Sequence, residues 1–190
     1  MDPVAALEAG LPVLLATDTV YGLMSTPGED AARTLYELKG REETQPTALL
    51  AATIEALLEA IPELDARQLR KLLPGPYTLV VRNPKGRFPW LTGGQPGPIG
   101  VRVPNLPEKT RAIVAATGVV LATSANDPGG PNPVMLDDVP RRIRDGCGAE
   151  LDLGPLPGTP STVIDLTREE PRILREGAVT ATEALRRLRA

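Results

Sequence analysis

The chain has 190 residues, of which 42% are hydrophobic and 24% are charged, and its formal net charge is -3. This length and composition predict one globular domain over residues 1–190, and the net charge argues against a globally basic nucleic-acid binder. The sequence contains no histidine, which excludes Ser-His-Asp and Cys-His catalysis and histidine-ligated zinc. Its one cysteine, Cys147, permits neither a disulfide within the chain nor a cysteine-rich metal site.

Hydrophobic periodicity and turn residues predict helices and strands that alternate along the chain. The first half is predicted to contain, in order, helix 4–9, strand 13–17, helix 29–38, strand 48–52, helices 54–60 and 64–73, and strand 77–82. The second half is predicted to contain a Pro/Gly-rich loop at 83–98, strand 99–103, helix 108–117, strand 119–122, a turn-rich loop at 127–133, a helix near 136–145, strand 150–153, a loop at 154–160, strands 162–166 and 172–174, and a final helix. Several strands follow one another without an intervening helix, so we expect an α/β fold with one mixed sheet.

The sequence gives no sign of a membrane segment. No stretch reaches the roughly 18 consecutive apolar residues that a membrane-spanning helix needs. The first residues, Met1-Asp2-Pro3, do not resemble a signal peptide. We therefore expect a cytoplasmic protein without a membrane partner.

Polar side chains gather where predicted strands end. They are residues 17–19, Arg102, residues 124–126 and Arg175. Open α/β sheets bind ligands at the carboxyl ends of their strands. We therefore expect these groups to share one cleft with Lys39 or Arg41, which would bring at least three cations together.

Two pairs of polar residues, Lys39 with Arg41 and Ser124 with Asn126, each flank a small residue. Lysine and arginine donate to anionic oxygens, and serine and asparagine add a hydroxyl and an amide. Together the four groups suit a phosphate or carboxylate ligand. The sequence has neither the glycine-rich P-loop nor the Gly-x-Gly-x-x-Gly pattern, so a nucleotide would be held by such side chains instead.

Each of these segments also has a purely structural interpretation. Residues 17–19 are compatible with a turn or a helix cap, and residues 124–126 with an Asx-type turn. Residues 39–41 are compatible with a helix C-terminus that carries a glycine cap. Arg102 stands in an apolar strand and needs either a ligand or an ion-pair partner, because an isolated buried charge is costly.

Seven segments carry a further pattern through their order along the chain. They are ATDTVYGL at 16–23, LKGR at 38–41, PGPYT at 74–78, IGVRVP at 99–104, TSAN at 123–126, PSTVID at 160–165 and ILREG at 173–177. Together they make the chain, from about residue 11 to residue 177, resemble the YrdC/Sua5 family, the threonylcarbamoyl-AMP synthases.

The resemblance implies a YrdC/RibB-like fold, in which a twisted, open mixed sheet flanked by helices surrounds a deep, positively charged cavity. It implies an L-threonylcarbamoyladenylate synthase, a nucleotidyltransferase that makes threonylcarbamoyl-AMP and pyrophosphate from L-threonine, bicarbonate and ATP, with Mg²⁺ accompanying the ATP. The product would pass to a tRNA-modifying transferase complex for the t6A modification of tRNA. A weak contact with tRNA or double-stranded RNA is a further expectation.

The resemblance also implies roles for nine residues by matched position. These are Lys39, Arg41, Ser124 and Asn126 for catalysis; Lys39, Arg41, Ser124, Asn132 and Arg175 for ATP binding; and Thr17, Arg102 and Ser161 for threonine binding. Arg102 is expected to pair with the amino-acid carboxylate, which a planar guanidinium binds through two parallel hydrogen bonds. We assign no side chain as a metal ligand.

Several positions depart from the family pattern. Ala16 and Glu42 stand where proline is usual, Gln45 where lysine is usual, and Pro98 where a threonine is common. Two other functions therefore stay open: a diverged YrdC-like paralogue, and a non-catalytic factor that binds double-stranded RNA or the ribosome. The two intact polar pairs argue against the first, and the net charge and 3% aromatic content argue against the second.

Overall fold

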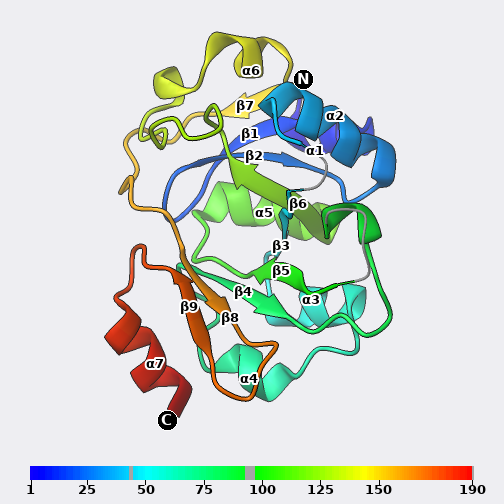
Figure 1. Cartoon of the computed structure of the whole chain (residues 1–190). Coiled ribbons are helices and arrows are strands. Elements are labelled where there is room, and N and C mark those ends of the chain that lie inside the picture. Colours follow the sequence, from blue (N-terminus) through cyan, green and yellow to red (C-terminus); the bar gives the residue numbers. More distant parts are fainter. Residues whose placement is uncertain (43–44, 93–96, 190) are drawn as a thin grey trace.

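The computed structural model describes residues 1–42, 45–92 and 97–189. In this part of the chain nine strands form one sheet, in the order β7-β1-β2-β6-β3-β5-β4-β8-β9 (Figure 1). The strands are β1 Val13–Ala16, β2 Tyr21–Ser25, β3 Ala48–Ala51, β4 Tyr77–Val81, β5 Ile99–Arg102, β6 Val119–Ser124, β7 Ala149–Leu151, β8 Thr162–Asp165 and β9 Arg172–Arg175. The helices are α1 Pro3–Glu8, α2 Glu29–Lys39, α3 Ile54–Ala60, α4 Ala66–Arg70, α5 Glu108–Thr117, α6 Arg141–Asp145 and α7 Ala181–Arg189, with short 3₁₀ helices η1 Pro89–Leu91 and η2 Leu136–Asp138.

The sheet is mixed, as the sequence predicts. β1 pairs parallel with β7, β3 with β5 and β4 with β8, whereas the other neighbouring strands pair antiparallel. The sheet is twisted and open, with β7 and β9 at its two edges. The predicted α/β fold class is therefore confirmed.

Alternate residues of the strands pack against helices on opposite faces of the sheet. On β1, Leu14 joins the larger buried cluster, which includes side chains of α2 and α3, while Leu15 joins the smaller cluster, which includes side chains of α1 and α5. Successive side chains of a strand point to opposite faces, so the sheet is covered by helices on both sides. None of the helices in the described ranges is long and apolar enough to cross a membrane.

Strand β2 was not among the predicted elements. All five of its residues are buried, so the strand carries no alternation of polar and apolar residues that would distinguish it from a loop. It pairs antiparallel with β1, and the residues between the two strands form a tight hairpin turn. This hairpin places the 17–19 segment between two buried strands.

Two predicted helices are wrong in extent. The helix near 136–145 divides into η2 and α6, and Pro140 lies between them, where it cannot donate to a continuing helix. The helix at 64–73 shortens to α4, which begins where the Asp65 carboxylate accepts from the N–H groups of Arg67 and Gln68. Other elements extend further than predicted at their C-terminal ends, since α2 ends at Lys39, β6 at Ser124 and β9 at Arg175.

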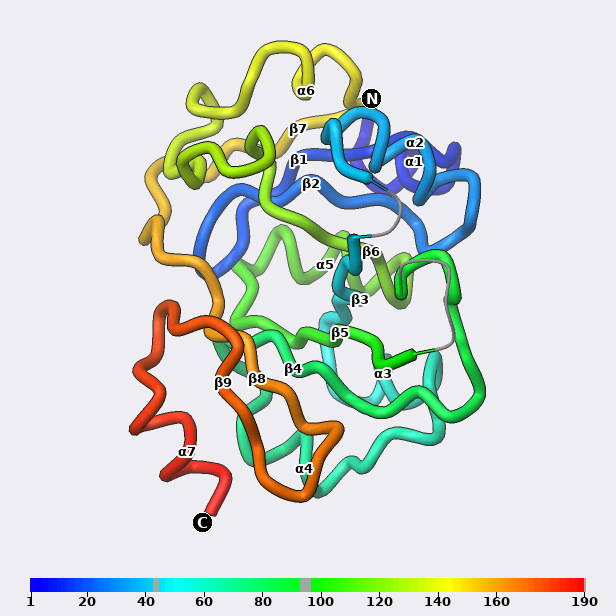
Figure 2. The backbone as a smooth tube through the Cα atoms, viewed as in Figure 1, coloured from blue at the N-terminus to red at the C-terminus, as the bar shows by residue number. Residues whose placement is uncertain are grey.

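A long connection links the two ends of the sheet. Between β7 and β8, residues 152–161 run from one edge of the sheet to the far side of it (Figure 2). The Tyr21 hydroxyl lies 2.8 Å from both the Asp152 carboxylate and the Gly154 carbonyl, which share its one proton, and it accepts from the Leu153 N–H (3.1 Å). The connection is thereby tied to β2, and it delivers Ser161 to the start of β8.

Candidate functional site

A cavity of about 450 Å³ lies over the middle strands of the sheet. It is on the same face as α1 and α5, because Met24 and Ala122, which line it, also belong to the smaller buried cluster. Seven of the nine predicted site residues line the cavity, namely Thr17, Arg41, Arg102, Ser124, Asn132, Ser161 and Arg175. Lys39 and Asn126 are the two that do not.

Lys39 lies behind the cavity wall rather than in it. Its side chain is 3% exposed, and its Nζ donates to the Ser124 carbonyl (2.6 Å), to Asn126 Oδ1 (2.7 Å) and to the Asn126 carbonyl. Burial, with a smaller contribution from neighbouring Arg41, lowers the pKa of Lys39 to about 8. All three ammonium donors are thus directed at residues 124–126, which Lys39 holds from the core side.

Gly40 turns the chain between Lys39 and Arg41. It is in the left-handed conformation, with φ at 66°, and its N–H donates to the last turn of α2. The turn lets Lys39 point into the core while Arg41 reaches the cavity. The glycine cap proposed from the sequence is therefore confirmed.

Arg41 is partly held by hydrogen bonds and partly unpaired. Its guanidinium donates to the Pro46 carbonyl and, at 3.4 Å, to Thr123 Oγ1. Its Nε is buried without a hydrogen-bond partner, and burial lowers its pKa. A guanidinium in this state favours an anionic oxygen as a ligand.

The Ser124–Asn126 pair forms a compact turn at the end of β6. Ser124 Oγ donates to Asn126 Oδ1 at 2.6 Å, and the Asn126 amide donates to the Gly130 carbonyl at 2.7 Å. Asn126 is 8% exposed and receives Lys39 on the same oxygen, so its side chain is used within the protein. Asn132, further along the loop, lines the cavity and donates to the Gly158 carbonyl at 3.5 Å.

Arg102 has an ion-pair partner in Asp18. Arg102 Nη2 lies 3.6 Å from Asp18 Oδ1, and both atoms, like Arg102 Nε, are buried without a hydrogen-bond partner. The other Asp18 oxygen accepts from the Asn105 N–H at 3.0 Å, which fixes the carboxylate. Burial lowers the pKa of Arg102, whereas Asp18 raises it and Arg175 lowers it further. The ion-pair interpretation of Arg102 is therefore confirmed, and the residue also lines the cavity.

Ser161 and Arg175 lie together at the β8–β9 side of the cavity. Arg175 Nη2 donates to the Ser161 carbonyl at 2.9 Å and lies 3.3 Å from Ser161 Oγ. Ser161 Oγ also bonds Thr78 Oγ1 at 2.8 Å. Thr78 was not assigned from the sequence, although it ends one of the seven matching segments. A Cβ at Gly177 would lie 2.2 Å from the Pro160 carbonyl oxygen, so only glycine permits this close approach of the two chain segments.

Thr17 is committed to the hairpin turn between β1 and β2. Its Oγ1 accepts from the N–H groups of Thr19 (3.2 Å) and Val20 (3.2 Å) and donates to the Val20 carbonyl (2.7 Å). The turn interpretation of residues 17–19 is therefore confirmed. Thr17 and Thr19 also line the cavity, so the turn forms part of its wall.

Thr47 is a cavity residue that the sequence analysis did not assign. It is 5% exposed, and its hydroxyl is buried without a hydrogen-bond partner. The carbonyl of Pro46, the preceding residue, accepts from Arg41, and this contact could not be predicted from the sequence.

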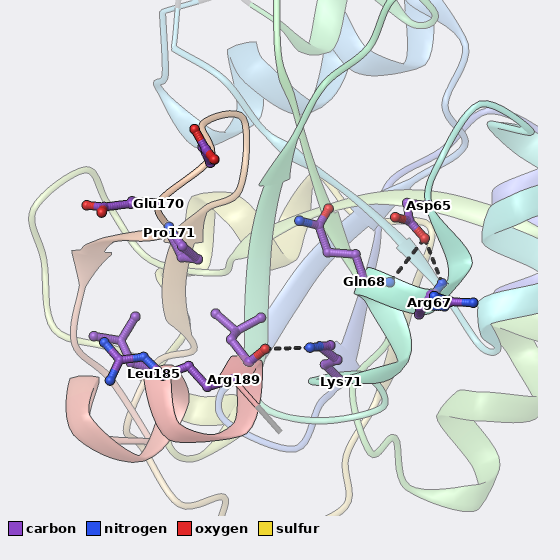
Figure 3. Close-up of a pocket in the computed structure, with 10 residues that line it drawn as sticks. Asp65, Arg67, Gln68, Lys71, Glu170, Pro171, Leu185 and Arg189 are labelled. Carbon is purple, nitrogen blue, oxygen red and sulfur yellow. Dashed lines mark hydrogen bonds between the residues drawn. The ribbon is translucent and has the colours of Figure 1, made fainter.

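A second hollow, of about 550 Å³, lies between α4, α7 and the turn before β9 (Figure 3). Lys71 Nζ donates there to the Leu188 carbonyl at 2.6 Å, and Asp65 is used to cap α4. Charges of both signs line this hollow, and it contains none of the nine predicted site residues. The predicted residues therefore converge on the first cavity.

The mixed sheet and its cavity define an α/β protein with a cationic cleft suited to anionic ligands. Residues 5–177 match the Sua5/YciO/YrdC family, which is described as "Telomere recombination", and the chain belongs to this family.

Its relatives include the threonylcarbamoyl-AMP synthase of Chromohalobacter salexigens, which is 34% identical over 89% of this chain and 93% of the relative. The threonylcarbamoyl-AMP synthase of Pyrococcus abyssi is 32% identical over 93% of this chain, which spans 53% of that longer protein.

Among solved structures, Pyrococcus abyssi Sua5 complexed with L-threonine is 29% identical, with a TM-score of 0.85, and the match covers 97% of this chain and 56% of that one. Escherichia coli YciO shares the fold, with a TM-score of 0.81 at 24% identity, over 93% of this chain and 88% of that one.

Proposed function

We propose that this protein is a threonylcarbamoyl-AMP synthase that uses L-threonine, bicarbonate and ATP. The observation that carries the proposal is the cavity itself, which Arg41, Arg102 and Arg175 line from three separate parts of the chain. Among ion pairs of the described residues, only that between Asp18 and Arg102 neutralises one of these cations. Such a cavity suits a ligand with several negative charges, and relatives of similar length carry the synthase name.

Threonine would occupy the part of the cavity formed by Arg102 and Ser161. The Arg102 guanidinium would receive the amino-acid carboxylate, and Asp18 would keep the guanidinium oriented from behind. The hydroxyls of Ser161 and Thr17 would border the same ligand. The solved Pyrococcus abyssi Sua5 complex with L-threonine supports a threonine site in this family.

ATP would bind against Arg41, Ser124, Asn132 and Arg175, with Arg175, which donates to the Ser161 carbonyl, on the side of the threonine. Lys39 would contribute by holding the 124–126 segment in place, in addition to the positive charge that it adds behind the wall. Mg²⁺ would arrive with ATP, since it commonly binds phosphate oxygens together with water, and it would neutralise phosphate charge when bound. The cations, hydroxyls and amides of the wall fit phosphate oxygens.

In the proposed reaction, the threonine nitrogen attacks the carbon of bicarbonate, a C–N bond forms and water leaves, which gives a carbamate. A carbamate oxygen then attacks the α-phosphorus of ATP, and the bond to the bridging oxygen of the β-phosphate breaks. Threonylcarbamoyl-AMP and pyrophosphate result. Negative charge accumulates on the phosphate oxygens during this step, and fixed arginines aimed at developing charge are the kind of catalytic group that stabilises it.

We further propose that the product serves t6A formation on tRNA through a separate transferase complex in the cytoplasm. The deciding experiment measures pyrophosphate release from Mg-ATP, with L-threonine present, omitted or replaced by L-serine, and with bicarbonate present or removed. Release that depends on both threonine and bicarbonate supports the synthase. A folded protein that binds ATP without release points to a diverged paralogue. Salt-sensitive RNA binding without ATP binding points to an RNA-binding factor.

A further inference from the structure

Strand β5 and the residue before it cross the cavity with alternate residues. Pro98, Gly100 and Arg102 line the cavity, whereas Ile99 and Val101 are fully buried in the core. A strand advances about 3.3 Å per residue, so the cavity extends along β5 for roughly 13 Å between the first and the last of these positions.

The two ends of this path carry different polar groups. At one end Arg102 pairs with Asp18, as described above. At the other end, Pro98 lies just before the segment of β5 that pairs parallel with β3. Pro46 lies shortly before β3, and its carbonyl accepts a hydrogen bond from Arg41. Gly100 is at the midpoint, paired with Ala48 on β3 and with Val80 on β4.

Neither the backbone nor the packing of the strand requires glycine at position 100. Gly100 is not among the glycines with positive φ. A Cβ built there would lie 3.5 Å from Cα and Cβ of Ala48 and 3.7 Å from Cγ2 of Thr78, which are ordinary contacts. The consequence of glycine at this position is therefore open space above the middle of the sheet.

We propose that glycine at position 100 keeps the two ends of the cavity continuous, so that two ligands bound at the two ends can meet above it. The inference rests on the proposed function, in which threonine carbamate at the Arg102 end must reach the α-phosphorus of ATP. A branched side chain at this position separates the two ligands without removing the groups that bind either one.

The test compares Gly100→Ala and Gly100→Val with the wild-type protein. L-threonine and ATP are titrated separately by calorimetry, ATP is then titrated in the presence of saturating threonine, and pyrophosphate release is measured. For Gly100→Val we expect each separate dissociation constant to stay within about twofold. We expect kcat to fall by about 100-fold or more, as is typical when reacting groups are displaced by about 1 Å from their productive positions. Gly100→Ala is expected to lose less than the valine variant.

Gly28→Val is the matched control. Gly28 precedes α2 with an ordinary φ of −71°, and a Cβ there meets nothing within 4 Å. This variant introduces the same side chain away from the cavity and should retain wild-type kcat. Thermal melts establish that each variant is folded.

Three results would overturn the proposal. They are an unchanged kcat in a folded Gly100→Val protein, a tenfold loss of affinity for one ligand measured alone, and joint binding of both ligands as tight as in the wild type. The joint-binding experiment needs no turnover. If the wild type releases no pyrophosphate, the proposed function fails, while loss of joint binding in Gly100→Val still supports the role of Gly100.

Discussion

Replacing Lys39 by methionine tests how the predicted catalytic pairs are held together. Methionine keeps an unbranched apolar side chain and removes the ammonium that donates to Ser124 and Asn126. Three acceptors, two carbonyls and the Asn126 amide oxygen, lose the ammonium as a donor, and the amide oxygen then accepts only from Ser124 Oγ. Each such loss costs about 1 kcal/mol, so we expect the free energy of unfolding to fall by about 3 kcal/mol.

The assay is urea denaturation of Lys39→Met beside the wild type, with Lys71→Met as a matched control. Lys71 also donates to a main-chain carbonyl, that of Leu188, but the residue is exposed, so its replacement should cost less than about 1 kcal/mol. We also expect Lys39→Met to lose pyrophosphate release, because the turn that carries Ser124 is no longer fixed. A loss of stability below about 0.5 kcal/mol would show that the hydrogen bonds of Lys39 do not brace this turn.

Three further predictions follow from the charges and burial of single residues. The pKa of Lys39 is about 8 in the native protein, against an ordinary value of 10.5. Between these two pH values the unfolded chain binds more protons than the native protein. The stability of the wild type relative to Lys39→Met should therefore rise with pH in this range. A constant difference in urea titrations from about pH 7.5 to 9.5 would contradict this. Arg102→Lys should weaken L-threonine binding by roughly 10- to 100-fold in calorimetry and leave ATP binding nearly unchanged, because lysine cannot pair bidentately with a carboxylate; equal losses for both ligands would refute the assignment. Burial, with a smaller contribution from Glu150, raises the pKa of Cys147 to about 12. Its thiol should therefore react with a disulfide reagent far more slowly in the native protein than in urea. Equal rates in the two states would disprove the burial.

The fold could be predicted from the sequence where an element buries only one face, and also where a strand is a continuous apolar run, as β1 is. Strand β5 alternates buried core residues with cavity residues, and helix α5 was predicted with its observed bounds. Strand β2 carries neither signal, because both of its faces are buried and Gly22 interrupts its apolar residues. The division of the helix near 136–145 was foreseeable from Pro140, which removes a backbone donor.

The sequence predicts which residues form the candidate site better than it predicts how their side chains are arranged. Residues distant in the sequence, such as Arg41 and Arg175, were expected in one cleft, and both line the cavity. Which residue of each pair would reach the ligand depends on the strand register and on the turn at Gly40, and neither is encoded in the residue types alone. The pairing of Arg102 with Asp18 depends in the same way on the hairpin that follows β1.

Each of the two pairs divides between the interior and the cavity. Lys39 and Asn126 meet each other behind the wall at 2.7 Å, whereas Arg41 and Ser124 line the cavity. The inner members therefore form the contact that fixes the outer members relative to one another, although the two segments are more than 80 positions apart in the chain. Exchange of an inner residue should consequently disturb both outer groups at once, while exchange of an outer residue should leave the inner contact and the stability of the fold intact. The spacing of one residue within each pair thus has a physical reason. It places one member in the interior, where the two segments contact each other, and the other member at the cavity, where it can face a ligand.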